Sequence, residues 1–221
     1  MEVHKRGWVE SQILLPRYGV LYKNSLNSSG TTLESVLGIP ANGVSGPDLA
    51  GWEVKAVPVK SLGRDPVGSL SLMDTSPDDG AFNSDFTGAM HKYGYPDPKT
   101  PKRLNFTGTH YFGSPHKRTG LTLDVVGADL KTGKVIDSTG GIILLDHKGD
   151  NAASWTFKKL IKIWNAKHGK VVFVPYVKKM QGGKVFFQYS GNPYFGVGTD
   201  FQKFMLAFFS GKVLYDPAHK F

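Results

Sequence analysis

The segment from Pro47 to Lys55 reads P-D-L-A-G-W-E-V-K, and it indicates more about the fold than any other part of the sequence. Successive side chains of an extended strand point to opposite faces, so Glu53 and Lys55 are expected to share one face. The proline favours extended geometry in the residue before it, and Gly51 permits a turn or bulge. We therefore expect Asp48 to fold back toward Glu53, which would bring two carboxylates and one ammonium group together.

Two carboxylates and a lysine in this arrangement suit the hydrolysis of a phosphodiester. Mg²⁺ prefers hard oxygen ligands such as carboxylates and water, and a nearby ammonium group can orient or deprotonate an attacking water. The alternative is an E-x-K pair that forms an ordinary ion pair on a half-solvated strand, because short motifs often match by chance. The acidic residue at position 48, after a proline and before a glycine, favours the catalytic interpretation.

The composition favours a soluble globular protein with a polyanionic partner. The chain has 221 residues, and its 27 Lys and Arg against 18 Asp and Glu give a net charge of +9. Such a charge suggests nucleic acid or an anionic membrane surface as the partner. The absence of cysteine excludes disulfides and thiolate zinc sites. No segment is apolar for long enough to span a bilayer, and no signal peptide is evident, so we expect a cytoplasmic protein.

The hydrophobic pattern predicts a mixed α/β chain, with helices at 30–37, 154–168 and 199–210. Strands are expected at 51–59, 69–73, 171–176, 184–189 and 213–215, and a hairpin is expected to pair 121–129 with 134–146. Residues 74–104 are rich in proline, glycine and aspartate, which predicts a long loop with one helical turn near 86–93.

Six short motifs carry a resemblance to known enzymes. They are T-L-E-S-V-L-G-I (32–39), P-D-L-A-G-W-E-V-K (47–55), R-L-N-F (103–106), G-G-I-I-L-L-D (140–146), W-T-F (155–157) and Y-D-P (215–217). Together with the order of the elements, they resemble the PD-(D/E)xK nuclease superfamily. Within it, the sequence is most similar to the MvaI/BcnI-type restriction endonucleases and, next to them, to the mismatch-repair nickase MutH. The likeness extends over most of the chain.

The resemblance implies a mixed α+β fold with a PD-(D/E)xK core, in which a central mixed sheet is flanked by helices. It implies one nuclease domain over residues 1–221, with two lobes around a DNA cleft. The catalytic lobe would consist mainly of 25–75 and 120–176. The DNA-recognition lobe would be formed by the loops 76–119 and 177–221.

The resemblance also implies roles for individual residues. Asp48 and Glu53 would bind the metal together with the backbone carbonyl of Val54, and Lys55 would position the nucleophilic water. Glu34 matches the acidic residue on the first helix that completes the site in these enzymes. The alternative for this glutamate is a capping box, in which it bonds back to the backbone amide of a helix cap at position 31.

The implied activity is site-specific hydrolysis of double-stranded DNA that depends on Mg²⁺, with Mn²⁺ able to substitute, and that leaves 5′-phosphate and 3′-hydroxyl ends. The resemblance further suggests a monomer that works beside a cognate DNA methyltransferase. Two alternatives stay open at this point. One is a MutH-like repair endonuclease that nicks one strand, and the other is a duplex-binding module without catalytic activity.

Two basic segments are expected to contact the DNA. The first, H-K-Y-G-Y-P-D-P-K-T-P-K-R (91–103), mixes basic, aromatic and proline residues, and the second is a basic cluster at 116–118. The alternative for both is a solvated basic loop. The residues expected to make these contacts are His91, Lys92, Tyr93, Lys99, Lys102, Arg103, His116, Lys117 and Arg118.

Overall fold

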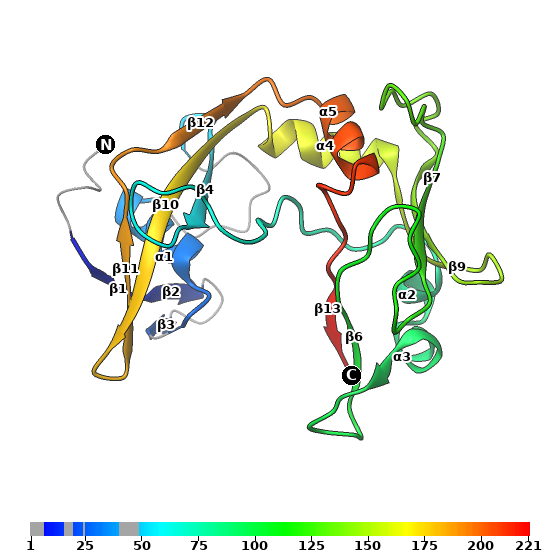
Figure 1. The fold of residues 1–221 in the computed structure, drawn as a ribbon, viewed down its shortest axis with the longest axis horizontal. Coiled ribbons are helices and arrows are strands. Elements are labelled where there is room, and N and C mark those ends of the chain that lie inside the picture. Colours follow the sequence, from blue (N-terminus) through cyan, green and yellow to red (C-terminus); the bar gives the residue numbers. More distant parts are fainter. Residues whose placement is uncertain (1–6, 16–19, 24, 40–48) are drawn as a thin grey trace. The chain divides into compact units, whose positions relative to one another are not determined.

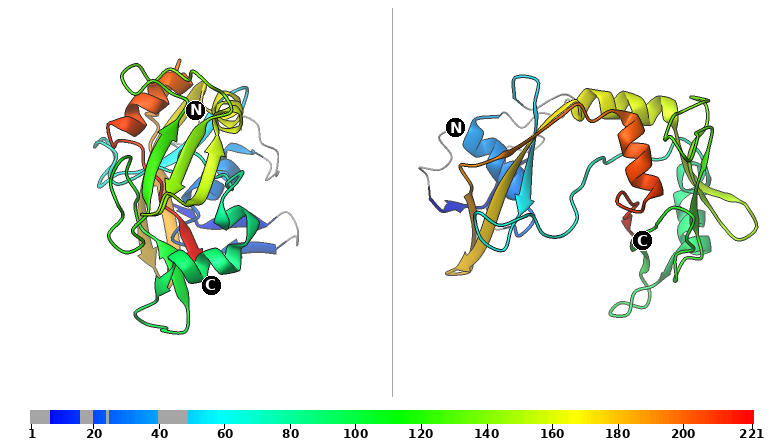
Figure 2. Two further views of the ribbon diagram at one scale, coloured as in Figure 1. Left: turned by 90° about the vertical axis from the view of Figure 1, so that its right-hand side faces the viewer. Right: turned by 45° about the horizontal axis from the view of Figure 1, so that its top comes forward.

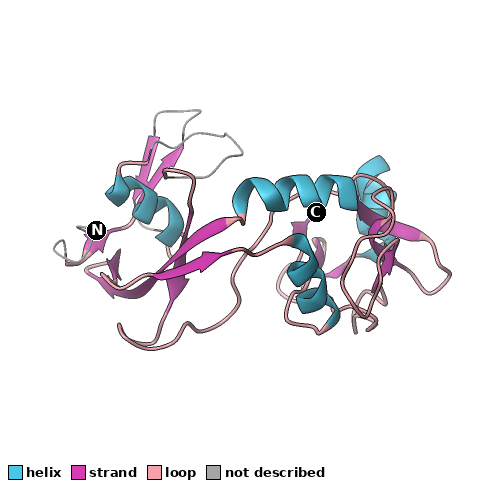
Figure 3. Cartoon of the chain, turned by 90° about the horizontal axis from the view of Figure 1, so that it is seen from above, coloured by secondary structure: helices cyan, strands magenta, loops and turns pink. Residues whose placement is uncertain are grey.

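The structure is a computed structural model that describes residues 7–15, 20–23, 25–39 and 49–221. The chain divides into two compact units (Figure 1). The first unit comprises Met1–Leu72 and Asn165–Thr199, and the second comprises Met73–Trp164 and Asp200–Phe221. Strands dominate the first unit, and most of the helices belong to the second (Figure 3).

A mixed sheet forms the centre of the first unit, with the long strand β10 (Lys170–Gln181) in its middle. Strand β4 (Glu53–Pro58) runs parallel to β10 along one edge. Strands β11 (Lys184–Tyr189) and β12 (Tyr194–Val197) pair antiparallel with successive parts of the other edge. Strand β1 (Val9–Glu10) pairs with β11. The sheet therefore has the mixed strand directions expected from the sequence.

Helix α1 (Ser29–Leu37) covers one face of this sheet. The buried cluster between helix and sheet consists of Leu33, Val54, Val172, Val174, Tyr176, Val185, Phe187 and Tyr189. The helix ends at Gly38, whose φ of 72° is the left-handed conformation that glycine adopts without strain. A hairpin of β2 (Gln12–Leu15) and β3 (Val20–Lys23) precedes the helix. Glu53 and Lys55 alternate with Val54 along β4 and therefore lie on the opposite face of the sheet.

Helix α1 begins earlier than the sequence predicts. The N-cap is Ser28, and the expected cap Thr31 lies inside the helix, where its hydroxyl donates to the Ser28 carbonyl over 3.1 Å. The reason is a tertiary contact, because Ser28 is buried and its hydroxyl lies 2.5 Å from that of Ser11. The capping box proposed for Glu34 is therefore wrong, since it required the cap at position 31.

The second unit contains an antiparallel sheet of β7 (Thr122–Val126), β8 (Gly141–Leu145) and β9 (Asn151–Thr156). These three strands lie side by side in the left view of Figure 2. A smaller sheet is formed by β5 (Tyr95–Pro96), β6 (Leu104–Thr107) and β13 (Ala218–Lys220). The helices are α2 (Ala81–Ser84), α3 (Phe86–Tyr93), α4 (Phe157–Lys167) and α5 (Phe201–Phe209). Helices α4 and α5 pack through the rings of Trp164 and Phe204, whose centroids lie 4.7 Å apart.

Most expected elements are present, and the differences have physical causes. The hairpin expected from 121–129 and 134–146 is confirmed as β7–β8, with shorter strands and a longer connection at 127–140, and the strand at 184–189 is confirmed as β11. Helix α4 begins at Phe157 rather than at 154, because residues 151–156 pair with β8 as a strand. No strand forms at 69–73, where the carbonyl of Leu72 accepts a hydrogen bond from the His168 ring instead of from a neighbouring strand. Residues 213–215 also form no strand, although Tyr215 makes a single bridge to His110.

The division into units differs from the expected lobes. Residues 120–164 belong to the second unit, whereas β4 belongs to the first. Residues 177–199 also belong to the first unit. The assignment of one lobe to DNA recognition stays a prediction. None of the described helices is long and apolar enough to cross a membrane.

Candidate active site

A tight turn precedes β4. Leu49 and Trp52 exchange two backbone hydrogen bonds, of 3.0 and 2.8 Å, around Ala50 and Gly51. The φ angles of these two central residues are 48° and 81°, the left-handed values typical of two-residue hairpin turns. The turn expected at this glycine is therefore present. Asp48 itself lies outside the residues that the structure describes, so its approach to the strand stays a prediction.

Ala50 is the one non-glycine residue with a positive φ in the described part of the chain. A left-handed conformation costs a residue with a Cβ about 1–2 kcal/mol. Glycine avoids this cost, but its greater freedom in the unfolded chain offsets part of the gain in stability. Ala50→Gly should therefore raise the free energy of unfolding by up to about 1 kcal/mol, and Gly51→Ala should lower it by about 1 kcal/mol. Urea denaturation measures both.

Gly30 provides the matched control for this prediction. It lies in α1 with open space around its Cβ position and no positive φ, so Gly30→Ala should stabilise the protein by about 0.5–1 kcal/mol. Ala50→Gly and Gly30→Ala are therefore opposite exchanges that should both stabilise. A destabilised Ala50→Gly protein would show that the turn is not strained.

Strand β4 holds Glu53 and Lys55 on one face of the sheet, as the alternation of the sequence predicts. Lys55 Nζ donates to Glu53 Oε1 over 3.2 Å, and the two side chains are 16% and 7% exposed. The second carboxylate oxygen, Glu53 Oε2, is buried and has no hydrogen-bond partner among the described residues. A buried carboxylate oxygen without a partner is unfavourable unless a ligand binds it. This oxygen therefore fits a divalent cation.

The rest of a metal site is not visible in the described part of the chain. No group of three or more histidine and acidic side chains converges there. Asp48, the second carboxylate expected at the site, is outside that part. The side chain of Val54 points into the core beneath α1, and its backbone carbonyl as a metal ligand stays a prediction.

Glu34 lies half-buried on α1, which packs against the sheet face that carries Val54 rather than the face that carries Glu53. Its charge contributes, after burial, to a raised pKa of Tyr189, so Glu34 lies near that phenol. The hydroxyl of Tyr189 donates to the carbonyl of Ser29 over 2.6 Å. A supporting role of Glu34 in the metal site stays a prediction.

A buried imidazole near Lys55 was not anticipated from the sequence. His168 is 2% exposed, and its Nε2 donates to the carbonyl of Leu72 over 2.9 Å. Burial, and next the positive charge of Lys55, lower the pKa of His168 to about 4. The imidazole is therefore neutral beside Lys55 at neutral pH. A single histidine at the end of a helix gives no signal in the sequence that it will be buried there.

The low pKa of His168 predicts a loss of stability in acid. The unfolded chain takes up this proton near pH 6.5, and the folded chain only near pH 4. Between these pH values the unfolded state binds more protons than the folded state. The contribution of the neutral imidazole to the free energy of unfolding is therefore complete above pH 6.5 and is lost as the pH falls, by up to about 1.4 kcal/mol per pH unit. Urea denaturation at a series of pH values should show that the free energy of unfolding depends less steeply on pH in His168→Gln than in the parent.

His147 is exposed in a turn, and His147→Gln serves as the control for this prediction. Its pH dependence should match that of the parent. If His168→Gln and the parent lose stability in parallel between pH 6.5 and 4, the burial of a neutral imidazole is not the cause.

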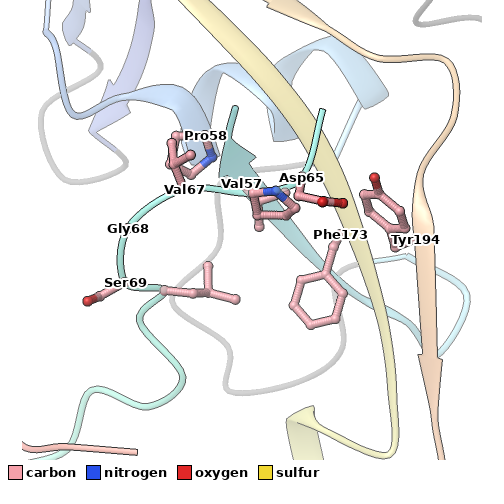
Figure 4. Close-up of a pocket in the computed structure, with 10 residues that line it drawn as sticks. Val57, Pro58, Asp65, Val67, Gly68, Ser69, Phe173 and Tyr194 are labelled. Atoms are coloured by element: carbon pink, nitrogen blue, oxygen red, sulfur yellow. The ribbon is translucent and has the colours of Figure 1, made fainter. Parts of the chain in front are cut away.

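A pocket of about 310 Å³ lies on the first unit beyond Lys55 (Figure 4). Val57 follows Glu53 and Lys55 on the same side of β4 and lines this pocket together with Phe173 of β10. Its other lining residues come from the end of β4, from the chain after it and from β12: Pro58, Asp65, Pro66, Val67, Gly68, Ser69, Leu70 and Tyr194. The lining is mainly apolar, with Asp65 as its one acidic side chain among the residues named.

The first expected DNA-binding segment contributes partly to the core of the second unit. Tyr93 is 6% exposed, and its hydroxyl donates to Asp146 over 3.3 Å. Lys92 forms ion pairs of 3.2 and 2.9 Å with Asp146 and Asp150. This placement argues against Tyr93 as a groove contact and partly neutralises Lys92. His91 is exposed at the end of α3.

The loop between β5 and β6 is organised by Asp97. Its carboxylate accepts hydrogen bonds from the guanidinium of Arg103, from the amide of Asn105 and from two backbone N–H groups, and these bonds hold the pKa of Asp97 well below its usual range. Arg103 therefore has a structural partner. Lys99 and Lys102 are exposed on this loop.

The second expected segment, the basic cluster at 116–118, lies in a turn. His116 stacks on the buried ring of His110, with centroids 4.2 Å apart, and its Nδ1 lies 3.0 Å from the hydroxyl of Thr119. Lys117 and Arg118 are exposed, and the guanidinium of Arg118 lies 4.9 Å from the ring centroid of Tyr95. Contact of this turn with DNA stays a prediction.

Comparisons with known proteins identify the family and the fold. The sequence model of the MvaI/BcnI restriction endonuclease family matches residues 1–220. The solved complex of restriction endonuclease MvaI with its cognate DNA substrate is similar in structure, with a TM-score of 0.69 and 17% identity over 98% of this chain and 79% of that chain. MvaI in the absence of DNA matches with a TM-score of 0.44 and 16% identity over 98% and 78% of the two chains. No curated protein matches. The resemblance and the mixed α+β fold expected from the sequence are confirmed.

Proposed function

We propose, from the premise that this chain belongs to the MvaI/BcnI restriction endonuclease family and is therefore a site-specific DNA endonuclease, that it hydrolyses both strands of double-stranded DNA in a reaction that requires Mg²⁺. The products would carry 5′-phosphate and 3′-hydroxyl ends. The observation that carries the proposal is the buried pair of Glu53 and Lys55, in which one carboxylate oxygen is left without a partner among the described residues.

Restriction endonucleases as a class use divalent metal ions, and Glu53 Oε2 has the chemistry to bind one. We propose that Asp48 and the carbonyl of Val54 complete the ligand set. A bound Mg²⁺ supplies positive charge that stabilises the phosphate in the transition state and lowers the pKa of a coordinated water. Mn²⁺ should substitute, because it accepts the same oxygen ligands.

Lys55 contributes through its position beside Glu53. One N–H of its ammonium group donates to Glu53 Oε1, which fixes the end of this flexible side chain. The remaining N–H groups can donate to the attacking water and hold it in line with the bond to be broken. Because the ion pair already exists in the protein alone, little reorganisation is needed when the substrate binds.

Double-stranded DNA as the substrate is supported by the net charge of +9 and by the similar structure of MvaI, which is a complex with its cognate DNA. We further propose that the protein acts as a monomer in a system with a cognate DNA methyltransferase. Sedimentation of the protein with a short duplex would give the mass of the complex. A mass with two protein chains would contradict the monomer.

A plasmid assay tests the reaction. Unmethylated supercoiled DNA should be converted first to open circles and then to linear molecules with Mg²⁺ or Mn²⁺, and to neither with EDTA. Sequencing of fragment ends from an unmethylated phage genome would then give the recognition site and the end chemistry. Absence of cleavage with both metals would contradict the proposal. Accumulation of open circles alone would favour a nickase related to MutH.

A further inference from the structure

The face of the mixed sheet that carries Glu53 continues onto the hairpin of β10 and β11. Val171 of β10 lies opposite Glu53, and every second residue of β10 points to the same face, up to Lys179. Lys179 pairs with Phe186 of β11, so these two side chains also share this face. Lys178 points to the opposite face, which is the one that α1 covers nearer the centre of the sheet.

The hairpin extends beyond β4 and β12, and at this level of the sheet β1 pairs with β11. Strand β4 ends at Pro58, opposite Tyr176, whereas β10 and β11 continue to a turn at Gly182 and Gly183 (Figure 1). Lys179 lies eight residues beyond Val171, which corresponds to about 26 Å along the strand. This distance is too long for Lys179 to reach the phosphate being cut, yet it is within the length of a short duplex.

Two aromatic rings hold the ammonium group of Lys179 in place. Its Nζ lies 4.4 Å from the ring centroid of Trp8 and 5.8 Å from that of Phe186. Both distances are within the range of cation–π attraction. Ordering a lysine in the free protein lowers the entropy lost when the lysine binds a ligand.

The charge of Lys179 is not compensated within the described part of the chain, where no carboxylate lies within ion-pair distance of it. The neighbouring cation on this face, Lys184, differs because it pairs with Glu10 over 3.3 Å. A fixed and uncompensated cation on the catalytic face is suited to a phosphate of a polyanion.

We propose that Lys179, held by Trp8 and Phe186, binds a backbone phosphate of the substrate DNA outside the bond that is cut. The proposal rests on the proposed function, because that function places DNA on this face. The hairpin thus adds a binding site in the first unit to the basic segments of the second. The same residues could instead serve only to fasten β1 to the sheet, and the experiment below separates the two roles.

The test compares two adjacent lysines by equilibrium binding to duplex DNA with Ca²⁺ in place of Mg²⁺. Loss of one phosphate contact lowers the slope of log K against log salt by about 0.9. The affinity ratio of parent to Lys179→Ala should therefore shrink by about 3.5-fold between about 50 and 200 mM salt. Lys178→Ala removes an exposed lysine from the other face and should leave the slope of the parent unchanged.

Thermal unfolding of each variant completes the test. If Lys179→Ala lowers the melting temperature while its salt slope equals that of the parent, the lysine only fastens β1 and the proposal is overturned. Equal loss of slope in both variants would also overturn it, because the face of the sheet would then not matter. Cleavage by the parent is measured separately, so failure of the nuclease reaction is distinguishable from failure of this contact.

Discussion

Glu53→Gln should reduce the rate of DNA cleavage by about 10³-fold or more while the protein still binds duplex DNA. The substitution keeps the shape of the side chain and removes its negative charge. In the parent, Glu53 Oε2 is buried and has no partner among the described residues, so this oxygen is the one available to a cation. Single-turnover cleavage with Mg²⁺, together with binding measured in Ca²⁺, separates the loss of chemistry from a loss of affinity.

Metal binding gives an independent measurement of the same residue. A ligand that binds only the folded state stabilises it by about 2.7 kcal/mol at a concentration of 100 times its Kd. Mg²⁺ should therefore raise the melting temperature of the parent and have little effect on Glu53→Gln. Asp65→Asn is a suitable control, because Asp65 is an exposed acidic residue of the same unit that lines the neighbouring pocket.

The control should cleave DNA and respond to Mg²⁺ as the parent does. A Glu53→Gln protein that cleaves at the rate of the parent, or that gains as much stability from Mg²⁺, would remove this carboxylate from the metal site and with it the basis of the proposed mechanism.

Lys55→Met should reduce the single-turnover rate by about 10²–10⁴-fold, the range associated with a positioned proton-transfer group. Methionine fills a similar volume but cannot donate to the attacking water. Lys60 lies exposed just after β4, and Lys60→Met provides the control, which should retain the activity of the parent. Full activity of Lys55→Met would exclude the ammonium group from the reaction.

The stability of Lys55→Met should also fall, because Glu53 would be left buried without its ion-pair partner. Removing one member of a buried ion pair costs about 3–5 kcal/mol, and less where water reaches the pair. The double variant Glu53→Gln with Lys55→Met should recover much of this loss, since no buried charge remains. Urea denaturation without metal measures the whole cycle. If the loss of stability in the double variant equals the sum of the losses in the two single variants, the two side chains do not interact.

Several features of the site could be predicted from neighbouring residues alone. The alternation along β4 places Glu53 and Lys55 on one face, and Gly51 permits the turn before the strand. Both depend on the conformational limits of a few adjacent residues, which the sequence specifies directly. The hairpin of β10 and β11 could have been predicted in the same way, because Gly182-Gly183 between two alternating strands indicates a tight turn. The alternation of β10 places Lys178 and Lys179 on opposite faces.

Other features depend on contacts between distant residues. Tyr93 lies in a segment expected to contact DNA. Its hydroxyl instead forms a hydrogen bond with Asp146, 53 residues away, and this contact places it in the core. Residues 154–156 are expected to begin a helix, yet they pair with β8 as the end of β9. Local sequence could not distinguish these outcomes, because the free energy that decides them comes from burial and pairing with partners far along the chain.

The sequence by itself therefore determined the family, the mixed fold and the local geometry of the catalytic strand, since motif, periodicity and turn residues act over a few positions. Only the tertiary structure decided which polar groups lack partners and which cations are held in place. Glu53 Oε2 has no partner among the described residues, and Lys179 reaches Trp8, because packing brings together or separates residues that are remote in sequence.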